Sequence, residues 1–198
     1  MTRVGPRYRV EFRRKREGKT DYRRRLRLLR SKKPRFVVRI SLRHISVQAI
    51  QFTPTGDVTK ASAHTKDLEK LGFKNGTSNL PAAYLVGLLC GYRSVKSGIG
   101  AAVFDIGEHG STPRGKIFAV LKGAIDSGLE IPHDVKVLPS EDTISGSSIS
   151  SYAIKLKEKD EKEYRSKFSV YLSLGLNPEN ISDHFNSIKR EIISQFGE

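Results

Sequence analysis

The sequence predicts an α/β fold: a mixed β-sheet, made of an antiparallel meander and one parallel strand and flanked by helices, with an extended basic N-terminal arm and a helical C-terminal extension. Three observations predict it. Strand-forming segments separated by turns fill residues 35–63. Between residues 80 and 128, two segments with apolar residues at helical spacing flank a short apolar strand. Positive charge is concentrated in the first 33 residues. Consecutive strands pair as a meander, and strand–helix alternation places helices on the sheet.

The first 33 residues, called the arm below, hold most of the excess charge. They carry fifteen Lys and Arg against three acids, a net of +12 of the chain's +15, and eleven of the fifteen are Arg. Arg matches phosphate with a planar fork and stacks on bases, and Tyr8, Phe12 and Tyr22 lie among these arginines. The pattern favours nucleic-acid binding. A solvated tail, a membrane-surface segment and a targeting segment are the alternatives, but such tails are usually rich in Lys and Ser.

The arm itself divides into two parts. Repulsion between cations, together with glycine and proline, predicts irregular chain over residues 1–19, and a short helix is predicted over 21–31. On that helix Tyr22, Leu26 and Leu29 share one face. We expect this apolar stripe to dock on protein while the arginines around it face a polyanion.

The core begins with three strands. β-branched residues predict a strand over 35–42, alternation predicts a second over 45–52, and a third, weaker strand covers 58–63. Arg43 and His44 form the turn between the first two strands. An exposed hairpin turn is one interpretation of this pair, and an extension of the arm's basic surface is the other.

Helices and one further strand complete the core. Residues 64–79 are polar and contain glycine, and a long helix is predicted between Asn79 and Gly98. A short, nearly all-apolar strand follows over 101–106, and a second helix lies between Gly115 and Gly128.

The C-terminal part is predicted to be helical beyond a linker. Six serines, a proline and a glycine over residues 139–151 indicate the linker, and a charged helical stretch follows over 151–168. A last helix after Asn177-Pro178 carries an apolar stripe that has to fold back on the core or dock on a partner. The predicted division is an arm over 1–33, an α/β core over 34–138, a Ser-rich linker over 139–150 and a helical extension over 151–198.

Composition argues against several classes of protein. Cys90 is the only cysteine, so no internal disulfide forms, and the five histidines lack the spacing of a metal site. Nucleotide-binding and serine-hydrolase motifs are absent, and no apolar run approaches the length of a membrane span. We therefore expect a cytoplasmic protein with no metal, no cofactor, no small-molecule substrate and no membrane partner.

A metal-dependent nuclease that uses Asp105 is the alternative function. Asp105 ends a central strand, Glu108 is near it in sequence, and Asp126 lies on the next helix. Two-metal hydrolysis needs several converging carboxylates, and the first strand contains no acid. We favour the interpretation that Asp105 accepts hydrogen bonds from backbone or Arg groups.

Specific runs of residues resemble a known family. Residues 5–10, 13–22, 25–29, 33–39 and 43–45, with Phe104-Asp105-Ile106-Gly107 and residues 114–124, resemble the 5S-rRNA-binding protein of the large ribosomal subunit, the family of large-subunit protein eighteen, called protein five in eukaryotes. The resemblance covers residues 1 to about 150, and the tail beyond resembles the archaeal branch.

This resemblance implies a structural ribosomal component with no catalytic activity and a ribonuclease-H-like topology. It implies binding of 5S rRNA, contacts to 23S rRNA in the central protuberance, and neighbouring large-subunit proteins that include the other 5S-binding protein. Lys116, beside Arg114 at a helix N-terminus, adds a second expected phosphate contact. The residues expected to contact rRNA are Arg3, Arg7, Tyr8, Arg9, Arg13, Arg14, Lys15, Arg16, Lys19, Tyr22, Arg23, Arg24, Arg25, Arg27, Arg43, His44, Arg114 and Lys116.

Overall fold

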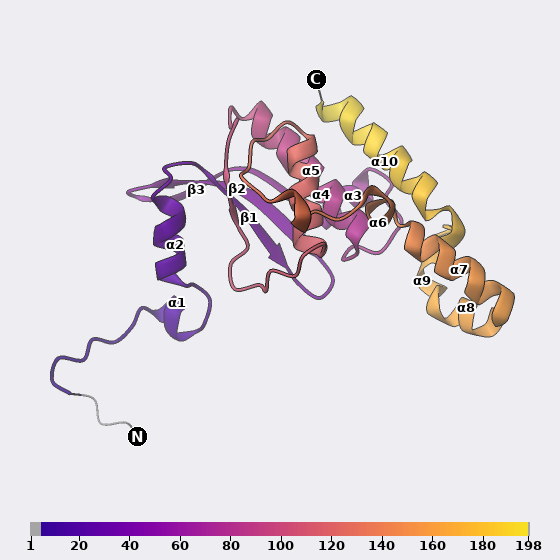
Figure 1. Cartoon of the computed structure of the whole chain (residues 1–198), viewed down its shortest axis with the longest axis horizontal. Coiled ribbons are helices and arrows are strands. Elements are labelled where there is room, and N and C mark those ends of the chain that lie inside the picture. The colour runs from indigo at the N-terminus through magenta and orange to yellow at the C-terminus, as the bar shows by residue number, and fades with distance from the viewer. Residues whose placement is uncertain (1–4, 198) are drawn as a thin grey trace.

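A four-stranded sheet with helices packed on it forms the centre of the computed structural model, which describes residues 5–197 (Figure 1). The arm leaves this centre on one side, and the C-terminal helices lie on the other. In chain order the elements are α1 (Arg13–Arg16), α2 (Tyr22–Leu29), β1 (Arg35–Ile40), β2 (Ile45–Thr53), β3 (Gly56–His64), α3 (Thr65–Lys70), α4 (Leu80–Lys96), β4 (Val103–Asp105), α5 (Lys116–Asp126), η1 (Val135–Val137), α6 (Glu141–Ser145), α7 (Ser147–Lys159), α8 (Glu161–Lys167), α9 (Ser169–Ser173), η2 (Pro178–Asn180) and α10 (Ile181–Phe196).

The sheet has the predicted mixed topology. Its strand order is β3-β2-β1-β4, with β1 antiparallel to β2, β2 antiparallel to β3, and β1 parallel to β4. Side chains alternate between the two faces of a strand, so Phe36 and Val38 of β1 enter the main core while Arg35 and Val37 face the other way. Both sets are buried, which shows that both faces of β1 are covered.

Helices α4 and α5 cover one face of the sheet. Asn79 caps α4 as predicted, since its side chain accepts a hydrogen bond from the Ala82 amide at 2.9 Å. Gly87 of α4 lies against the backbone of Val120, and Gly123 of α5 lies against the backbone of Tyr84. The two glycines therefore allow the two helix backbones to touch, and α4 is buried along most of its length.

Helical structure occurs in three segments where none was predicted. Residues 1–19 were predicted to be irregular, but Arg13–Arg16 form the single turn of α1. Residues 64–79 contain a helix, α3, whose first turn is closed by a capping box between His64 and Asp67. The predicted linker over 139–150 is mostly helical, because it contains α6 and the start of α7. Leu68 of α3 and Ile144 of α6 are both buried in the main core, and this burial stabilises helices too short to persist alone.

The C-terminal extension folds back on the core. The predicted apolar stripe of α10 is buried, and Phe185 packs against Tyr84 of α4 with ring centroids 5.6 Å apart. A second, smaller cluster of buried residues holds α7 to α8 and contains Ala153, Leu156, Tyr164 and Phe168. No described helix is both long and apolar enough to cross a membrane.

Candidate nucleic-acid interface

The beginning of the arm is open to solvent throughout its described part. Arg7, Tyr8 and Arg9 lie in irregular chain, and the four cations Arg13, Arg14, Lys15 and Arg16 make up the single turn of α1. All of these side chains are exposed. Arg3 lies outside the described residues.

Acidic residues of the arm pair with some of its cations. Lys15 contacts Glu11, and Glu17 lies 2.8 Å from the Lys19 amine and 3.7 Å from the Arg13 guanidinium. These pairs are exposed, and exposed pairs contribute little to stability. The cations therefore remain available to a polyanion that replaces the carboxylate.

Aromatic side chains stand among these cations. Tyr8 is 59% exposed and Phe12 is 71% exposed, and the rings of Phe12 and Tyr22 lie 5.3 Å apart. A hollow of about 920 Å³ opens beside them, lined partly by Arg9 and Arg23. Flat rings beside guanidinium groups suit the stacking of unpaired bases. Phe12 is missing from the residues predicted to contact RNA, although its position among arginines was the available signal.

Helix α2 faces the sheet with polar side chains and Leu28, so the prediction that the stripe of Tyr22, Leu26 and Leu29 docks on protein is wrong. Leu26 is 59% exposed, and Tyr22 contacts Phe12 of the arm. The contacts to the sheet come instead from Asp21, which caps α2, and from two arginines of the helix. The reason lies in the sheet, whose face beneath α2 presents arginine and aspartate side chains.

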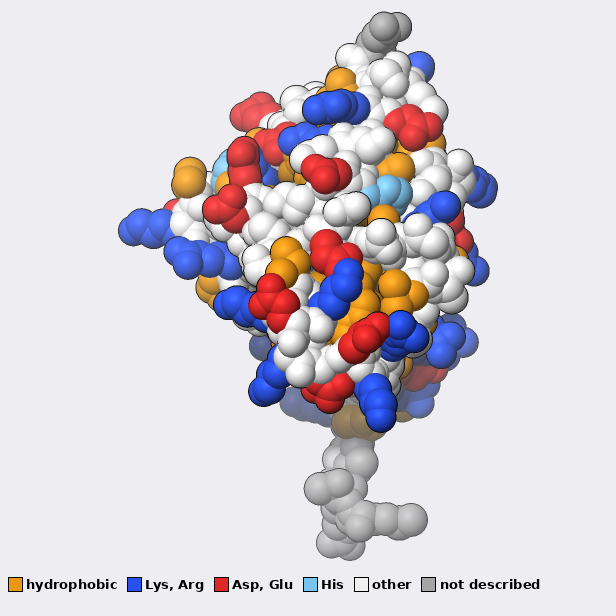
Figure 2. Space-filling model, turned by 90° about the vertical axis from the view of Figure 1, so that its right-hand side faces the viewer, with side chains coloured by type: hydrophobic (Ala, Val, Ile, Leu, Met, Phe, Trp, Pro, Cys, Tyr) orange, Lys and Arg blue, Asp and Glu red, His pale blue; other side chains and the backbone are white. Residues whose placement is uncertain are grey.

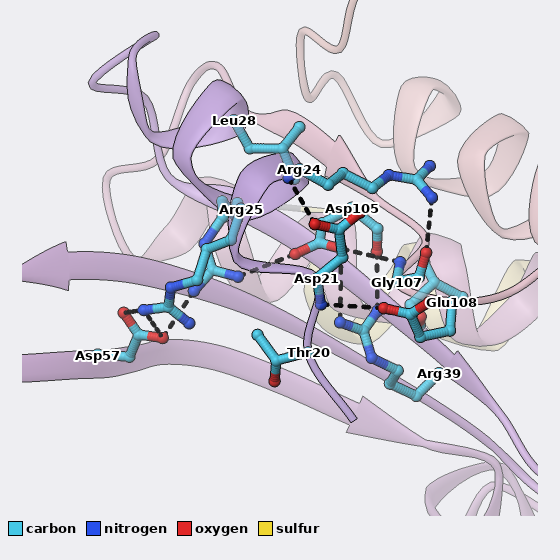
Figure 3. Close-up of polar contacts among 12 residues, drawn as sticks. Thr20, Asp21, Arg24, Arg25, Leu28, Arg39, Asp57, Asp105, Gly107 and Glu108 are labelled. Atoms are coloured by element: carbon cyan, nitrogen blue, oxygen red, sulfur yellow. Dashed lines mark hydrogen bonds and ion pairs between the residues drawn. The ribbon is translucent and has the colours of Figure 1, made fainter. Parts of the chain in front are cut away.

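Those charged groups form a network on β1 and its neighbours (Figure 3). The Arg35 guanidinium, 4% exposed as a residue, lies 2.7 Å from the Asp57 carboxylate and 2.9 Å from that of Asp105. Arg39 lies 3.4 Å from Asp105, and the Gly107 amide donates a hydrogen bond to the same carboxylate at 2.9 Å. A buried guanidinium therefore has two carboxylate partners, as burial of a charge requires.

Asp105 has the role that the sequence analysis favoured. Burial by itself raises the pKa of its carboxyl, but Arg39, the Gly107 amide and Arg35 together hold that pKa below its ordinary value of 3.8. The side chain is thus a charged partner of arginines rather than one of several converging carboxylates. Within residues 5–197 no group of three or more His, Cys, Asp and Glu side chains is arranged to hold a metal ion.

The Arg43-His44 turn is fixed by hydrogen bonds to the core. His44 Nδ1 lies 3.0 Å from the Thr65 hydroxyl, and the Thr77 hydroxyl donates to the Arg43 carbonyl. His44 is therefore half-buried and held by protein groups, whereas the Arg43 side chain is exposed. The β1–β2 register puts this turn at the opposite end of the strand pair from Asp57, which α2 contacts.

The second basic pair lies before α5. Arg114 is exposed in a left-handed backbone conformation with φ of 60°, and Lys116 is the first residue of α5. The Lys116 amine donates a hydrogen bond to the Ser78 hydroxyl at 3.3 Å. Gly115 caps α5 without a side-chain hydrogen bond, so this helix end presents amide groups together with two cations.

Comparisons with known proteins give a consistent result. A family model described as "Ribosomal large subunit proteins 60S L5, and 50S L18" matches residues 6–99, which include the arm from Pro6, the whole meander and α4. A protein of the archaeon Caldivirga maquilingensis, described as large ribosomal subunit protein uL18, is 51% identical over 191 residues, which is 96% of this chain and 92% of the relative.

Proposed function

The chain belongs to the family of ribosomal large subunit proteins 60S L5 and 50S L18, and from this premise we propose that it binds 5S rRNA and helps to attach it to 23S rRNA in the central protuberance. The family is one of structural ribosomal proteins and not of enzymes. The chain is thus a component of the large ribosomal subunit.

The exposed arm is the observation that carries the proposal. Its cations are concentrated in one segment, and its aromatic rings are exposed beside them rather than packed in the core. Arginines that touch phosphates position a protein on RNA, while unpaired bases that stack on aromatic rings provide selectivity. Tyr8 and Phe12 are the arm's most exposed rings, so we assign base stacking to them.

The core contributes the remaining contacts in this proposal. Arg43 projects from a turn that the core holds in place, and Arg114 and Lys116 surround the start of α5. Because all three stand on ordered structure, they bind RNA without the entropic cost of ordering a flexible segment. The C-terminal helices, which carry charges of both signs, are the part that we assign to neighbouring large-subunit proteins.

A binding experiment with two RNAs tests the proposal. The full chain is titrated with 5S rRNA and with a structured RNA of matched size over a series of salt concentrations. We expect tighter binding of 5S rRNA, and a log–log slope steeper than about −4 if about six phosphates are neutralised at about 0.7 each. A flat salt dependence, or equal affinity for both RNAs, would contradict the proposal.

Single substitutions locate the selectivity in the same assay. Arg13→Ala removes a cation that positions the chain, so it is expected to weaken binding of both RNAs equally. Tyr8→Ala removes a stacking ring, which costs about 1–3 kcal/mol per base and is expected to weaken 5S rRNA binding more than that of the control RNA.

A further inference from the structure

We propose that Asp57 is a positioning residue for RNA binding: with Arg35 and Asp105 it holds α2 on the sheet before RNA arrives, so that two arginines of the helix dock it and the others face outward. The inference rests on the proposed RNA-binding function of the arm. It assigns a favourable role to a negative charge on a protein whose ligand is a polyanion.

Three polar contacts join α2 and its cap, Asp21, to the core (Figure 3). Arg25 donates through one guanidinium nitrogen to both oxygens of Asp57, each at 2.9 Å. Arg24 donates to the Gly107 carbonyl at 2.7 Å, and the Asp21 amide donates to the Glu108 carboxylate at 3.0 Å. These contacts link residues 32 to 87 positions apart in sequence, so they depend on the folded core.

Asp57 is itself held in place by a buried arginine of β1. One of its oxygens accepts a hydrogen bond from Arg35 at 2.7 Å, and Arg35 is fixed by its second carboxylate, Asp105. The side chains of Arg35 and Asp105 are 5% and 7% exposed, whereas those of Asp57 and Arg25 are 27% and 30% exposed. Arg25 therefore contacts the exposed end of a series of ion pairs that runs through Asp57 and Arg35 to Asp105. Because Arg35 and Asp105 are buried, they fix the position of the Asp57 carboxylate that Arg25 contacts.

This arrangement divides the arginines of α2 and its C-cap into two groups. Arg24 and Arg25 are engaged with the core. Arg23, Arg27 and Arg30 are exposed and have no side-chain hydrogen bond or ion pair within residues 5–197. Docking of the first group fixes the direction in which the second group points.

The docking contacts matter because α2 has only eight residues. An isolated helix of this length is marginal in water, even with Asp21 as a cap. If only a fraction of the molecules has α2 formed and docked, the apparent association constant for RNA is the intrinsic constant multiplied by that fraction. Loss of the Asp57 contact is thus expected to weaken RNA binding even though it removes a negative charge.

The proposal and simple electrostatics predict opposite changes in RNA affinity when the negative charge of Asp57 is removed, and a pair of variants distinguishes them. Asp57→Asn is compared with Glu69→Gln, which removes the same charge from an exposed position of α3. If charge alone mattered, both variants would bind RNA as tightly as the wild type or more tightly. We expect Asp57→Asn to weaken 5S rRNA binding about three- to tenfold, and Glu69→Gln to leave it unchanged or to tighten it.

A second pair of variants guards against a general loss of folding. Arg25→Gln breaks the same contact from the arm and leaves the Arg35–Asp57 pair intact. It is compared with Arg23→Gln, which removes the same charge from a residue of α2 that makes no side-chain hydrogen bond or ion pair within residues 5–197. Both variants lose one cation that could meet phosphate, so Arg25→Gln is expected to weaken RNA binding more than Arg23→Gln, and equal losses would contradict the proposal. In the double variant Asp57→Asn with Arg25→Gln, the loss is expected to equal that of Arg25→Gln alone, because both changes break one interaction. Additive losses would overturn the proposal.

Hydrogen exchange of the RNA-free protein separates this inference from the proposed function. Amides of residues 22–29 are expected to lose protection in Asp57→Asn, while those of α4 keep it. If wild-type protein fails to select 5S rRNA but this loss is seen, the docking role stands and the choice of RNA is wrong. If the wild type binds 5S rRNA, and Asp57→Asn matches Glu69→Gln in affinity and the wild type in protection, Asp57 has no positioning role.

Discussion

At the scale of single residues, Gly87 and Gly123 set the distance between α4 and α5. A Cβ atom added at Gly87 would lie 2.1 Å from the Val120 carbonyl oxygen, and one at Gly123 would lie 2.2 Å from the Tyr84 carbonyl oxygen. Both obstacles are backbone atoms, which cannot rotate away. The α4–α5 contact, on which one face of the sheet rests, therefore requires the absence of a side chain at these two positions.

We expect Gly87→Ala to lower the free energy of unfolding by about 2 kcal/mol, because the two helices have to separate to accommodate the methyl group. Urea denaturation measures this change. Gly110→Ala is the matched control, since a Cβ there has no atom within 4 Å, and it is expected to change stability by less than about 0.5 kcal/mol. Equal effects of the two substitutions on the free energy of unfolding would show that stability does not depend on the close approach of α4 and α5.

The partners of Asp105 illustrate how far single residues can be predicted. Its role as an acceptor of arginine hydrogen bonds follows from the lack of further acids on the first strand. Its partner Arg35 lies 70 positions earlier and reaches it only because β1 and β4 pair in parallel. Likewise, the exposure of Leu26 depends on the polar face of the sheet beneath α2, which no pattern within the helix reveals.

At the scale of elements, the long periodic segments were predictable and the short helices were not. Apolar spacing located α4, α5 and α10, β-branched residues located β1, and alternation located β2. Helices α3 and α6 have six and five residues, too few for a periodic signal. Their stability comes from core burial of Leu68 and Ile144, which is a property of the tertiary fold.

Helix α10 offers a test with its own internal control. Ile192 is fully buried against the main core, whereas its neighbour Ile193 is 41% exposed. We expect Ile192→Ala to lower the free energy of unfolding by about 3 kcal/mol and Ile193→Ala by less than 1 kcal/mol. Urea denaturation compares them. A small effect at both positions would mean that α10 does not unfold together with the core.

At the scale of the whole molecule, the arm and the core make separate contributions. Among the described residues, the main core cluster contains none from 5–33, so we expect the sheet and its helices to fold without the arm. We expect a chain that begins at residue 34 to unfold cooperatively, with a circular dichroism spectrum of a folded α/β domain. Its affinity for RNA is expected to fall by about a hundredfold or more, because most phosphate contacts are lost. An unfolded truncated chain would show that the division at residue 33 is wrong.

The two ends of the molecule differ in electrical character. The arm, at one end, has a net charge of +12, while residues 139–198 hold eight Lys and Arg against ten Asp and Glu. Figure 2, which views the end formed by the C-terminal helices, shows blue and red side chains interspersed there. The protein is therefore an electric dipole with its positive pole on the arm. In the field of a polyanion such a dipole experiences a torque, within about 8 Å of the surface at physiological salt. We therefore expect the molecule to rotate before contact, so that productive collisions begin at the arm.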